Sequence, residues 1–383
     1  MRISVIKESS ASEPRVSASA ETVKRYVGLG AEVIVASGAG VASGIGDGEY
    51  EGAGGTVVAD NAAAVAGADV VLGVRRPDAA SLKGAKLGAL VIAIMDPYGH
   101  EAELDALAKA GVSTFAMELM PRITRAQVMD VLSSQANLAG YRAVVDASAE
   151  FGRAFPMMMT AAGTVPAARV FVMGAGVAGL QAIATARRLG AVVSATDVRP
   201  AAKEQVESLG AKFIAVEDEE FKQAETAGGY AKQMSAEYQA KQAALVAAHI
   251  AKQDVVITTA LIPGRPAPKL VSGEMVAAMK AGSILVDLAV ERGGNVEGAV
   301  PGEVVTTANG AKIVGYLNVP GRLAATASQL YAKNLYAFVE TLVDKGTKTL
   351  GVKWDDELVK ATLLTKDGAV VHPNFKPAEA SAA

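Results

Sequence analysis

The chain has 383 residues, a length that suits two domains, each able to bury a hydrophobic core. Its net charge of −3 offers no basic surface, which argues against nucleic acid as a partner. The absence of cysteine excludes disulfides, thiolate catalysis and cysteine metal sites, and three scattered histidines do not predict a metal cluster. We therefore predict neither a metal site nor a nucleic-acid interface.

The N-terminus begins with an apolar, strand-like segment rather than with a signal peptide. The longest stretch without a charged residue is 170–186, which is close to the lower length limit of a membrane span. Its glycines and Gln181 fit a strand, a turn and a helix better. We therefore expect a soluble, cytoplasmic protein with no membrane span of its own.

In the first half of the chain, apolar β-branched runs alternate with amphipathic segments, which is typical of a parallel α/β sheet. The runs predict strands near residues 3–6, 32–36, 56–59, 69–74, 90–95 and 112–116. Helices fit between them, for example at 20–29 and 101–110. One long helix is then predicted over 125–153, where apolar residues recur at helical spacing and proline is absent. We expect this helix to connect two domains.

Residues 170–199 carry the most informative pattern. A strand at 170–173 leads into Gly174, Gly176 and Gly179 with the spacing G-x-G-x-x-G, and a helix of small residues follows. In a dinucleotide site, such glycines permit a tight turn, close approach of backbone to pyrophosphate, and close packing of helix and strand. The N-terminus of the helix then offers N–H groups to phosphate. The alternative is a glycine-rich turn in an α/β fold that binds no nucleotide.

Asp197 follows the next predicted strand, at 192–195. An acidic side chain there accepts hydrogen bonds from the adenosine ribose and repels a 2′-phosphate, so the sequence favours NAD(H) as the cofactor. Further strands are predicted at 212–216, 254–258, 283–287 and 312–314. Because ligands bind beyond the carboxyl ends of such strands, we expect Thr259, Ala260 and Leu261 at the cofactor edge, and residues 287–295 beside them.

A helix predicted over 323–343 would return the chain to the first domain, and residues 348–372 have the pattern of a β-hairpin. The predicted fold is α/β, with two Rossmann-like doubly wound domains, the first discontinuous, joined by long helices with a cleft between them. The first domain comprises residues 1–125 and 325–383, and the NAD(H)-binding domain comprises 134–324.

Several segments are distinctive beyond their secondary structure. They include MELMPRITRAQVMDVLSSQANLAGYRAV at 117–144, FPMMMTAAGTVPAARV at 155–170, ATDVRPAAKEQVESLGAKFI at 195–214 and TTALIPGRPAP at 258–268. Together with the glycine segment, they resemble the NAD(H)-binding component, called domain I, of the proton-translocating nicotinamide nucleotide transhydrogenases. The similarity covers essentially the whole chain. The same superfamily includes alanine dehydrogenase, which shares the two-domain fold.

The resemblance implies direct hydride transfer between NAD(H) on this chain and NADP(H) held by a partner subunit, coupled to proton translocation by a membrane subunit. The chain contains neither membrane helices nor a second nucleotide domain, so it resembles the bacterial arrangement in which domain I is a separate polypeptide. A homodimer is also implied, as is a peripheral position on the cytoplasmic face of the bacterial inner membrane through the partner subunits.

The resemblance also implies a nicotinamide-end loop, with Gln127, Arg122 and Asp130 as candidate catalytic residues. Gln127 would help to hold two rings at about 3–3.5 Å, and Arg122 and Asp130 would pair and orient the carboxamide. Tyr230 would lie on a mobile loop that closes over the nucleotide. Without the resemblance, these residues fit a helix N-terminus and a solvated segment. The full predicted nucleotide site comprises Arg122, Gln127, Ser133, Gly174, Gly176, Val177, Ala178, Gly179, Asp197, Val198, Arg199, Tyr230, Thr259, Ala260 and Leu261.

Two alternatives belong to other classes of protein. A soluble oxidoreductase like alanine dehydrogenase is the first, because Arg15 matches the carboxylate-binding arginine of that group. However, Arg75 stands at its lysine position, Asp96 stands near its catalytic histidine, and His100 is out of register. An arginine cannot relay protons as a titratable lysine does, which argues against this activity. The second alternative is a non-catalytic NAD-binding module, against which the complete nicotinamide-end loop argues.

Overall fold

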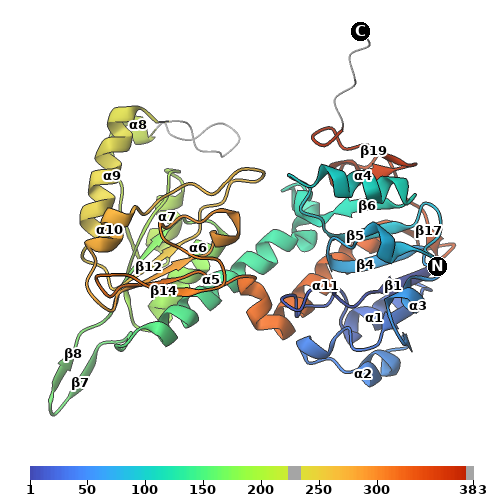
Figure 1. The fold of residues 1–383 in the computed structure, drawn as a ribbon, viewed down its shortest axis with the longest axis horizontal. Coiled ribbons are helices and arrows are strands. Elements are labelled where there is room, and N and C mark those ends of the chain that lie inside the picture. Colours follow the sequence, from blue (N-terminus) through green and yellow to red (C-terminus); the bar gives the residue numbers. More distant parts are fainter. Residues whose placement is uncertain (223–233, 377–383) are drawn as a thin grey trace, which may run out of the picture. The chain divides into compact units, whose positions relative to one another are not determined.

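A computed structural model describes residues 1–222 and 234–376 of the chain (Figure 1). The chain divides into two compact units, Met1–Gln135 with Gly321–Ala383, and Ala136–Pro320. The first unit is therefore discontinuous in sequence, as predicted. Each unit is built on its own sheet, and parallel strands dominate both sheets.

The first unit contains a mixed sheet, coloured blue to teal and red in Figure 1. Its strands are β1 (Arg2–Val5), β2 (Glu32–Ala36), β3 (Thr56–Val58), β4 (Val70–Arg75), β5 (Leu90–Ile94), β6 (Ser113–Ala116), β18 (Leu363–Lys366) and β19 (Ala369–Val370). They lie in the order β19-β18-β6-β5-β4-β1-β2-β3. Strands β1 to β6 are parallel, whereas β18 pairs antiparallel with β6 and with β19. A short antiparallel pair, β16 (Val343–Asp344) and β17 (Thr349–Leu350), lies outside this sheet.

Helices cover both faces of the first sheet, which explains why its central strands β4 and β5 are almost continuously apolar. The helices of this unit are α1 (Ala20–Gly28), α2 (Asp47–Gly52), α3 (Asn61–Val65), α4 (Glu101–Lys109), α11 (Ala324–Thr341) and α12 (Glu357–Thr362), with 3₁₀ turns η1 (Val41–Ser43), η2 (Ala79–Leu82), η3 (Met117–Leu119) and η4 (Thr124–Met129). Tyr26 of α1 and Phe338 of α11 share one core with Leu72. Leu104 of α4 shares the other core with Val71.

The second unit contains a sheet with the same central arrangement. Its strands are β9 (Arg169–Met173), β10 (Val192–Thr196), β11 (Lys212–Phe213), β12 (Val255–Thr258), β13 (Ile284–Asp287), β14 (Val304–Thr306) and β15 (Lys312–Val314). The order is β11-β10-β9-β12-β13-β15-β14, and only the edge strand β14, which was not predicted, runs antiparallel to its neighbour. The first strand of each sheet therefore lies where the strand order reverses, as in doubly wound folds.

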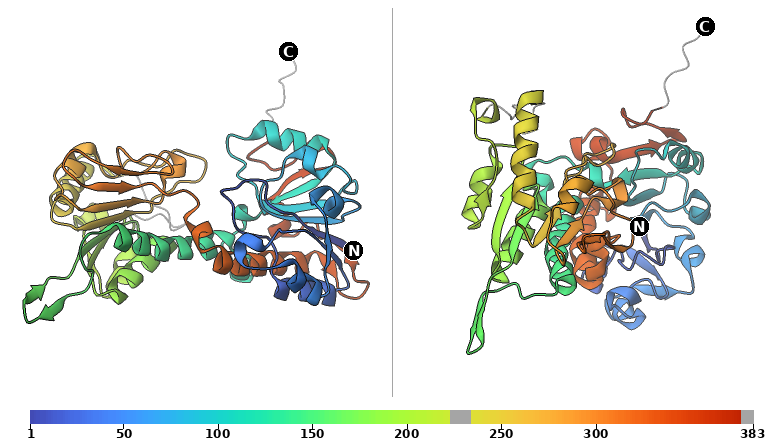
Figure 2. Two further views of the ribbon diagram at one scale, coloured as in Figure 1. Left: turned by 60° about the horizontal axis from the view of Figure 1, so that its bottom comes forward. Right: turned by 60° about the vertical axis from the view of Figure 1, so that its left-hand side comes forward.

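Helices also cover both faces of the second sheet, as Figure 2 shows. They are α6 (Val177–Arg188), α7 (Ala202–Ser208), α8 (Glu219–Lys222), α9 (Ala236–Ile250) and α10 (Gly273–Ala277), with the 3₁₀ turn η5 (Val290–Arg292). Ile183 of α6 shares one core with Val172, and Ile250 of α9 shares the other core with Phe171. The chain passes between the units within α5 (Val131–Glu150) and returns within η6 (Val319–Leu323).

The predicted single helix over 125–153 is wrong at its beginning. Residues 124–129 form the 3₁₀ turn η4, and α5 begins only at Val131. The cause is Asp130, whose carboxylate accepts hydrogen bonds from the backbone N–H of Ser133 at 2.8 Å and from its hydroxyl at 2.5 Å. Such an acceptor satisfies an N–H group that has no partner within the helix, so it sets the first turn. Asp130 itself was the available sequence signal, because Asp is a preferred N-cap residue.

The predicted hairpin over 348–372 is only partly right. Strands β18 and β19 form a hairpin around Asp367 and Gly368, both of which have positive φ. Before them, however, residues 357–362 form α12, because the carboxylate of Asp356 accepts a hydrogen bond from the N–H of Leu358 at 2.8 Å. The acidic cluster therefore begins a helix rather than a turn between strands.

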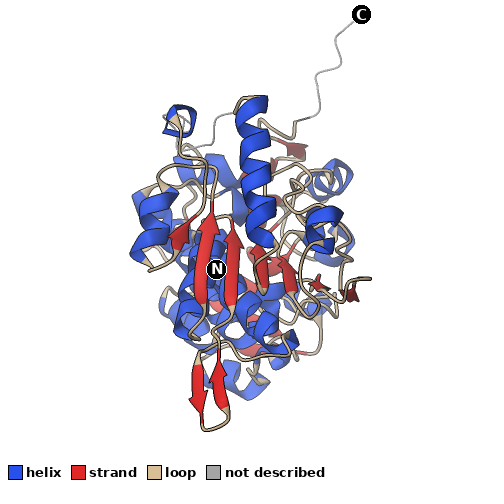
Figure 3. Ribbon diagram, turned by 90° about the vertical axis from the view of Figure 1, so that its left-hand side faces the viewer, coloured by secondary structure: helices blue, strands red, loops and turns tan. Residues whose placement is uncertain are grey.

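A hairpin in the second unit was not predicted at all. Strands β7 (Met158–Thr160) and β8 (Gly163–Val165) pair only with each other, and Figure 3 shows them projecting beyond the sheet of the unit. None of the helices in residues 1–222 and 234–376 has the length and apolar character needed to cross a bilayer. Tyr230, predicted at a mobile loop, lies outside the described residues.

Candidate functional site

The glycine motif of the second unit forms the turn between β9 and α6. Gly174 has a φ of +105°, which other residues adopt only with strain, and a Cβ built there would overlap the hydroxyl of Thr259. A Cβ built at Gly179 would overlap the carbonyl of Gly174. Gly176, in contrast, is exposed, and a Cβ there would meet nothing within 4 Å. The turn therefore packs closely against the protein at Gly174 and Gly179 and is open to a ligand at Gly176.

The first turn of α6 is suited to an anion. Gly176 is its N-cap and supplies no side chain to satisfy the first N–H groups of the helix. Helix α5 packs against this turn so closely that a Cβ built at Gly140 would overlap the carbonyl of Ala178. Helix α5 therefore holds this backbone on one side, while Gly176 leaves it open on the other. The residues present thus fit a dinucleotide pyrophosphate.

Asp197 lies directly beyond β10 and faces the glycine turn. Its Oδ2 accepts a hydrogen bond from the N–H of Ala175 at 2.7 Å. Its Oδ1 accepts from the backbone N–H and the Nε of Arg199, both at 2.9 Å, and a guanidinium NH2 group of Arg199 lies 3.1 Å from Oδ2. The carboxylate therefore connects the end of the second strand to the turn after the first.

Three of the predicted contact residues present exposed apolar side chains at this end of the sheet. Val177, Val198 and Leu261 are 39%, 64% and 54% exposed. They follow the carboxyl ends of β9, β10 and β12. Apolar surface beside open backbone donors is the usual composition of a cofactor site.

Thr259 and Ala260 are held in place by the glycine turn and by Asn295. The hydroxyl of Thr259 donates to the carbonyl of Gly174 at 3.2 Å. The side-chain amide of Asn295 donates to the carbonyls of Ala260 and Pro268 at 2.9 and 2.8 Å, and its oxygen accepts the N–H of Ala260 at 3.0 Å. Asn295 is fully buried, so it fixes the loop from behind.

Asp287 has a similar role further from the turn. Its carboxylate, only 1% exposed, accepts the backbone N–H groups of Ala289 and Val296, each at 2.9 Å. Gly294 is required beside it, because a Cβ there would lie 2.7 Å from Oδ2. The sequence predicted residues 287–295 at the cofactor edge. In the structure, Asp287 and Asn295 are buried supports of that edge and do not belong to its surface.

The predicted nicotinamide-end residues all lie in the first unit. Arg122 and Gln127 are exposed, and Ser133 is half-buried in the first turn of α5. The predicted Arg122–Asp130 pair does not form, since the Asp130 carboxylate caps α5 through Ser133 and no ion pair between Arg122 and Asp130 occurs in the described residues. The loop therefore presents Arg122 and Gln127 to solvent, with Asp130 used as a structural acceptor.

Arg125 anchors this loop, a role that the sequence did not suggest. Its guanidinium pairs with both carboxylate oxygens of Asp356 at 2.8 and 3.0 Å and with Glu357 at 2.9 Å. These acids begin α12, so the loop is tied to the C-terminal segment of the unit. The sequence separation of the partners hid the contact.

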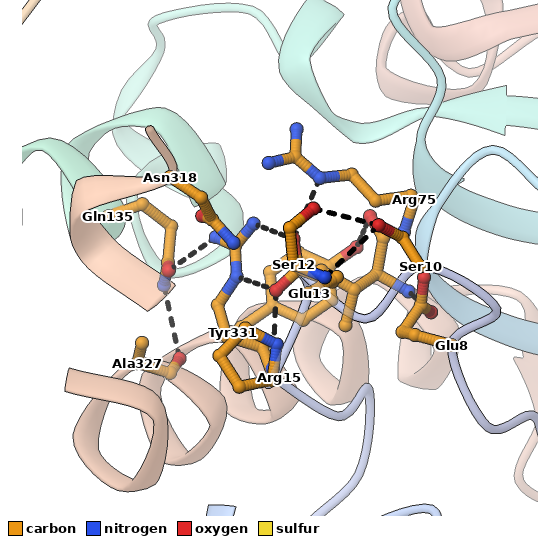
Figure 4. Close-up of polar contacts among 12 residues, drawn as sticks. Glu8, Ser10, Ser12, Glu13, Arg15, Arg75, Gln135, Asn318, Ala327 and Tyr331 are labelled. Atoms are coloured by element: carbon orange, nitrogen blue, oxygen red, sulfur yellow. Dashed lines mark hydrogen bonds and ion pairs between the residues drawn. The ribbon is translucent and has the colours of Figure 1, made fainter. Parts of the chain in front are cut away.

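A buried ion network lies at the carboxyl ends of β1 and β4 in the first unit (Figure 4). The Glu13 carboxylate pairs with Arg15 through contacts of 2.7 and 2.6 Å and with Nε of Arg75 at 2.8 Å. Arg15 also donates to the side-chain oxygen of Gln135 at 2.8 Å. Burial alone would raise the pKa of Glu13, but the hydrogen bonds and charges of Arg15 and Arg75 outweigh it and lower the pKa.

Glu8 lies beside this network and behaves differently. Its carboxylate accepts the backbone N–H of Val74 at 2.7 Å and that of Arg75 at 3.3 Å. Burial raises the pKa of Glu8 to about 7, since these hydrogen bonds and Arg15 do not compensate for lost hydration, and Glu13 adds like-charge repulsion. Glu8 is therefore a group whose charge changes near neutral pH.

Asp96 and His100, which bear on the alanine-dehydrogenase alternative, lie between β5 and α4. The backbone N–H groups of Met95 and Asp96 donate to the half-buried carboxylate of Glu118, and Asp96 has a φ of +46°. Nδ1 of His100 lies 2.8 Å from the backbone oxygen of Asp96. In the described residues, no group of three or more Asp, Glu or His side chains is arranged to hold a metal ion.

Known proteins resemble the chain over nearly its whole length. The family models named Alanine dehydrogenase/PNT, N-terminal domain and C-terminal domain match residues 4–139 and 143–373. An NAD(P) transhydrogenase subunit alpha polypeptide of Rhodospirillum rubrum is 57% identical over 378 residues, which cover 97% of this chain and 98% of that protein. A crystal structure of transhydrogenase from Sinorhizobium meliloti has 61% identity and a TM-score of 0.85, covering 98% of this chain and 100% of that one. An L-alanine dehydrogenase structure has 25% identity and a TM-score of 0.81, covering 98% of each chain.

Proposed function

The chain belongs to the alanine dehydrogenase/PNT family, and we propose that within it the chain is the NAD(H)-binding subunit of a proton-translocating transhydrogenase. The observation that carries the proposal is the turn at Gly174, Gly176 and Gly179, open at Gly176 and backed by Asp197. The similarity to transhydrogenase subunits over nearly the whole chain supports the same role. The homodimer and the peripheral membrane position implied by the resemblance belong to this proposal.

The second unit provides nucleotide binding in this mechanism. The N–H groups at the start of α6 hold the pyrophosphate, and the Asp197 carboxylate accepts from the ribose. Thr259 and Ala260, supported by Asn295, form the neighbouring wall. Bound nicotinamide supplies the hydride donor or acceptor. The protein contributes position and exclusion of water, because direct transfer between two rings needs no acid, base or metal from the chain.

The first unit carries Arg122 and Gln127, which the resemblance assigns to the nicotinamide end. Both side chains are exposed on a loop that Arg125 ties to Asp356 and Glu357. A long, neutral amide such as that of Gln127 both donates and accepts hydrogen bonds, so it can position a carboxamide or ribose without adding charge near a moving hydride. Asp130 acts indirectly, by setting where α5 begins.

The proposal is tested by mixing the purified chain with an NADP(H)-binding transhydrogenase domain, NADPH and an oxidised NAD analogue. We expect a rapid burst of hydride transfer that requires both proteins. If the chain binds NADH and the partner domain is functional but no transfer occurs, the proposed function is wrong. Pyruvate with ammonium and NADH would then test the alanine-dehydrogenase activity.

The role of Gln127 is tested in the same assay. Gln127→Ala should slow the burst while leaving the NADH dissociation constant nearly unchanged, because ring positioning matters in the reaction more than in binding. Thr124→Ala, an exposed neighbour in the same loop, serves as the matched control. Equal losses in binding and in rate would make Gln127 an ordinary binding residue.

A further inference from the structure

The pair formed by Asp197 and Arg199 has a property that an isolated acid at this position would lack. An ionised carboxylate has about four acceptor positions on its two oxygens. Four donors already use them, namely the N–H of Ala175 and the backbone N–H, Nε and NH2 groups of Arg199. A ribose hydroxyl can therefore gain an acceptor on Asp197 only by displacing some of the contact with Arg199.

The two side chains differ in exposure. The side chain of Asp197 is 7% exposed, whereas that of Arg199 is 34% exposed. The arginine is therefore the more accessible side chain of the pair, and its NH2 group also lies 3.4 Å from the carbonyl of Ala175, beside the glycine turn. Arg199 follows β10, the strand after which the 2′-hydroxyl of the adenosine ribose is bound in this type of fold.

The chemistry of the two groups is opposite towards a 2′-phosphate. A carboxylate repels it, whereas an arginine near this position is the group that accommodates it in folds that bind NADP(H). This chain carries both groups two residues apart, with the arginine engaged by the acid. The nearby cation Lys203, on α7, is instead paired with Glu217 at 2.5 Å.

We propose that Arg199 is a specificity-determining residue whose capacity to bind a 2′-phosphate is held in check by Asp197. The inference rests on the proposed NAD(H) binding of the second unit. On this view, Asp197 selects NAD(H) in two ways: it repels the 2′-phosphate and it occupies the guanidinium that would bind it. Removing the carboxylate should then admit NADP(H), but only while Arg199 is present.

The test uses equilibrium titration calorimetry of the full chain with NADH and with NADPH, so that no catalytic turnover is needed. Asp197→Asn keeps the shape of the side chain and removes its charge. We expect NADH to bind about tenfold more weakly and NADPH about tenfold more tightly than to the unmodified chain, the scale of one charge-assisted hydrogen bond in each case. In Asp197→Asn/Arg199→Gln, the gain in NADPH affinity should disappear.

Two further measurements make the test specific. Asp197→Asn/Lys203→Gln removes a nearby cation that is paired elsewhere, so it should keep the NADPH affinity of Asp197→Asn. Titration with adenosine 2′,5′-bisphosphate against adenosine 5′-monophosphate isolates the 2′-phosphate, and Asp197→Asn should favour the former only when Arg199 is present. Asp197→Ser, with the same second-site partners, replaces Asp197→Asn if circular dichroism shows that Asn disturbs the fold.

The outcomes separate this inference from the proposed function. If Asp197→Asn and Asp197→Asn/Arg199→Gln bind NADPH equally well, charge repulsion by Asp197 explains the selectivity alone and the inference is overturned. No gain in NADPH affinity in either Asp197 variant would overturn it as well. If the unmodified chain binds neither NADH nor NADPH, the proposed function itself fails, whatever the variants show.

Discussion

The two units of this chain contain sheets with the same central strand order, yet they end their first strands in different ways. In the second unit, β9 joins α6 through Gly174, Ala175 and Gly176 alone. In the first unit, residues 6–19 separate β1 from α1. The short glycine connection leaves Gly176 exposed, with nothing within 4 Å of a Cβ built there. The long connection instead fills the corresponding strand ends with Glu8, Glu13 and Arg15.

This difference shows that the doubly wound architecture provides a place for a ligand but does not by itself make a site there. In the first unit, the Glu8 carboxylate accepts the N–H groups of Val74 and Arg75, donors that would otherwise be available at the end of β4. Glu13 and Arg15 neutralise each other with 2% exposure each. In the second unit, the equivalent edge has open backbone and exposed apolar side chains.

The largest expected effect comes from breaking the ion network of the first unit. Arg15→Met leaves the buried Glu13 with Arg75 as its remaining charged partner, so the free energy of unfolding should fall by about 3–5 kcal/mol. Thermal and denaturant unfolding measure it. Glu13→Gln/Arg15→Met should recover some of the loss, because residue 13 is then no longer a buried carboxylate that has lost the Arg15 guanidinium. A loss as small as that of Arg25→Gln, which breaks an exposed pair with Glu21, would show that the network is not a stabilising element.

The next effect concerns the pH dependence of the same region. Burial raises the pKa of Glu8 from 4.5 to about 7, so the folded protein favours the protonated form. The corresponding stabilisation is complete below about pH 4.5 and is lost as the pH rises through about 7. Glu8→Gln cannot ionise. Between pH 4.5 and pH 8, its free energy of unfolding relative to the unmodified chain should therefore rise by about 3 kcal/mol.

Denaturant unfolding at a series of pH values checks the Glu8 prediction. The groups that face Glu8, namely the backbone N–H groups of Val74 and Arg75 and the side chains of Glu13 and Arg15, are the same in both proteins. Their contributions therefore largely cancel in the difference. Glu32→Gln, at an exposed position in the same sheet, is the control. Parallel pH profiles for Glu8→Gln and the unmodified chain would contradict the prediction.

A third prediction concerns the glycine turn of the second unit and its effect on NADH binding. Gly179→Ala places a Cβ against the carbonyl of Gly174, so the turn must shift, and NADH should bind about 100-fold more weakly. Gly28→Ala, in α1 of the first unit, adds a Cβ that meets nothing within 4 Å and should leave binding unchanged. Equal NADH affinity of both variants would remove the turn from the site.

The smallest effect tests a support behind the site. Asn295→Asp keeps an acceptor for the N–H of Ala260 but loses the donors to the carbonyls of Ala260 and Pro268, so NADH affinity should fall about tenfold. Asn309→Asp removes similar amide donors, to Val276 and Met279, away from the glycine turn. It should lower the melting temperature without weakening NADH binding. Equal changes in NADH affinity would reduce Asn295 to a general structural role.

Much of the fold was predictable because its signals are local. The apolar runs predicted β2 and β15 with their observed bounds and most other strands within one or two residues. The glycine spacing predicted the turn at 174–179 and the acid at 197. Local signals were also present where prediction failed: Asp130 and Asp356 are N-caps, and each begins a helix where a longer helix or a hairpin was expected.

What the sequence could not reveal depends on contacts between distant segments. Arg125 meets Asp356 and Glu357 only because the C-terminal segment returns to the first unit. Asn295 supports Ala260 only because β12 and β13 lie side by side. Neither pairing has a periodicity or spacing that a single sequence displays.

The sequence by itself determined the doubly wound class, the glycine turn and the acidic residue after the second strand. These features follow from backbone sterics and short-range hydrogen bonding, which act over a few residues. The tertiary structure decided which polar groups lie on the surface of the site, where a ligand can contact them, and which lie beneath it and support the loops. Whether a polar group is exposed or is a support depends on its burial and on partners far apart in sequence, as Asp287, Asn295 and Glu8 show. The physical reason is that the free-energy cost of removing a charge or an amide from water is set by all the groups packed around it.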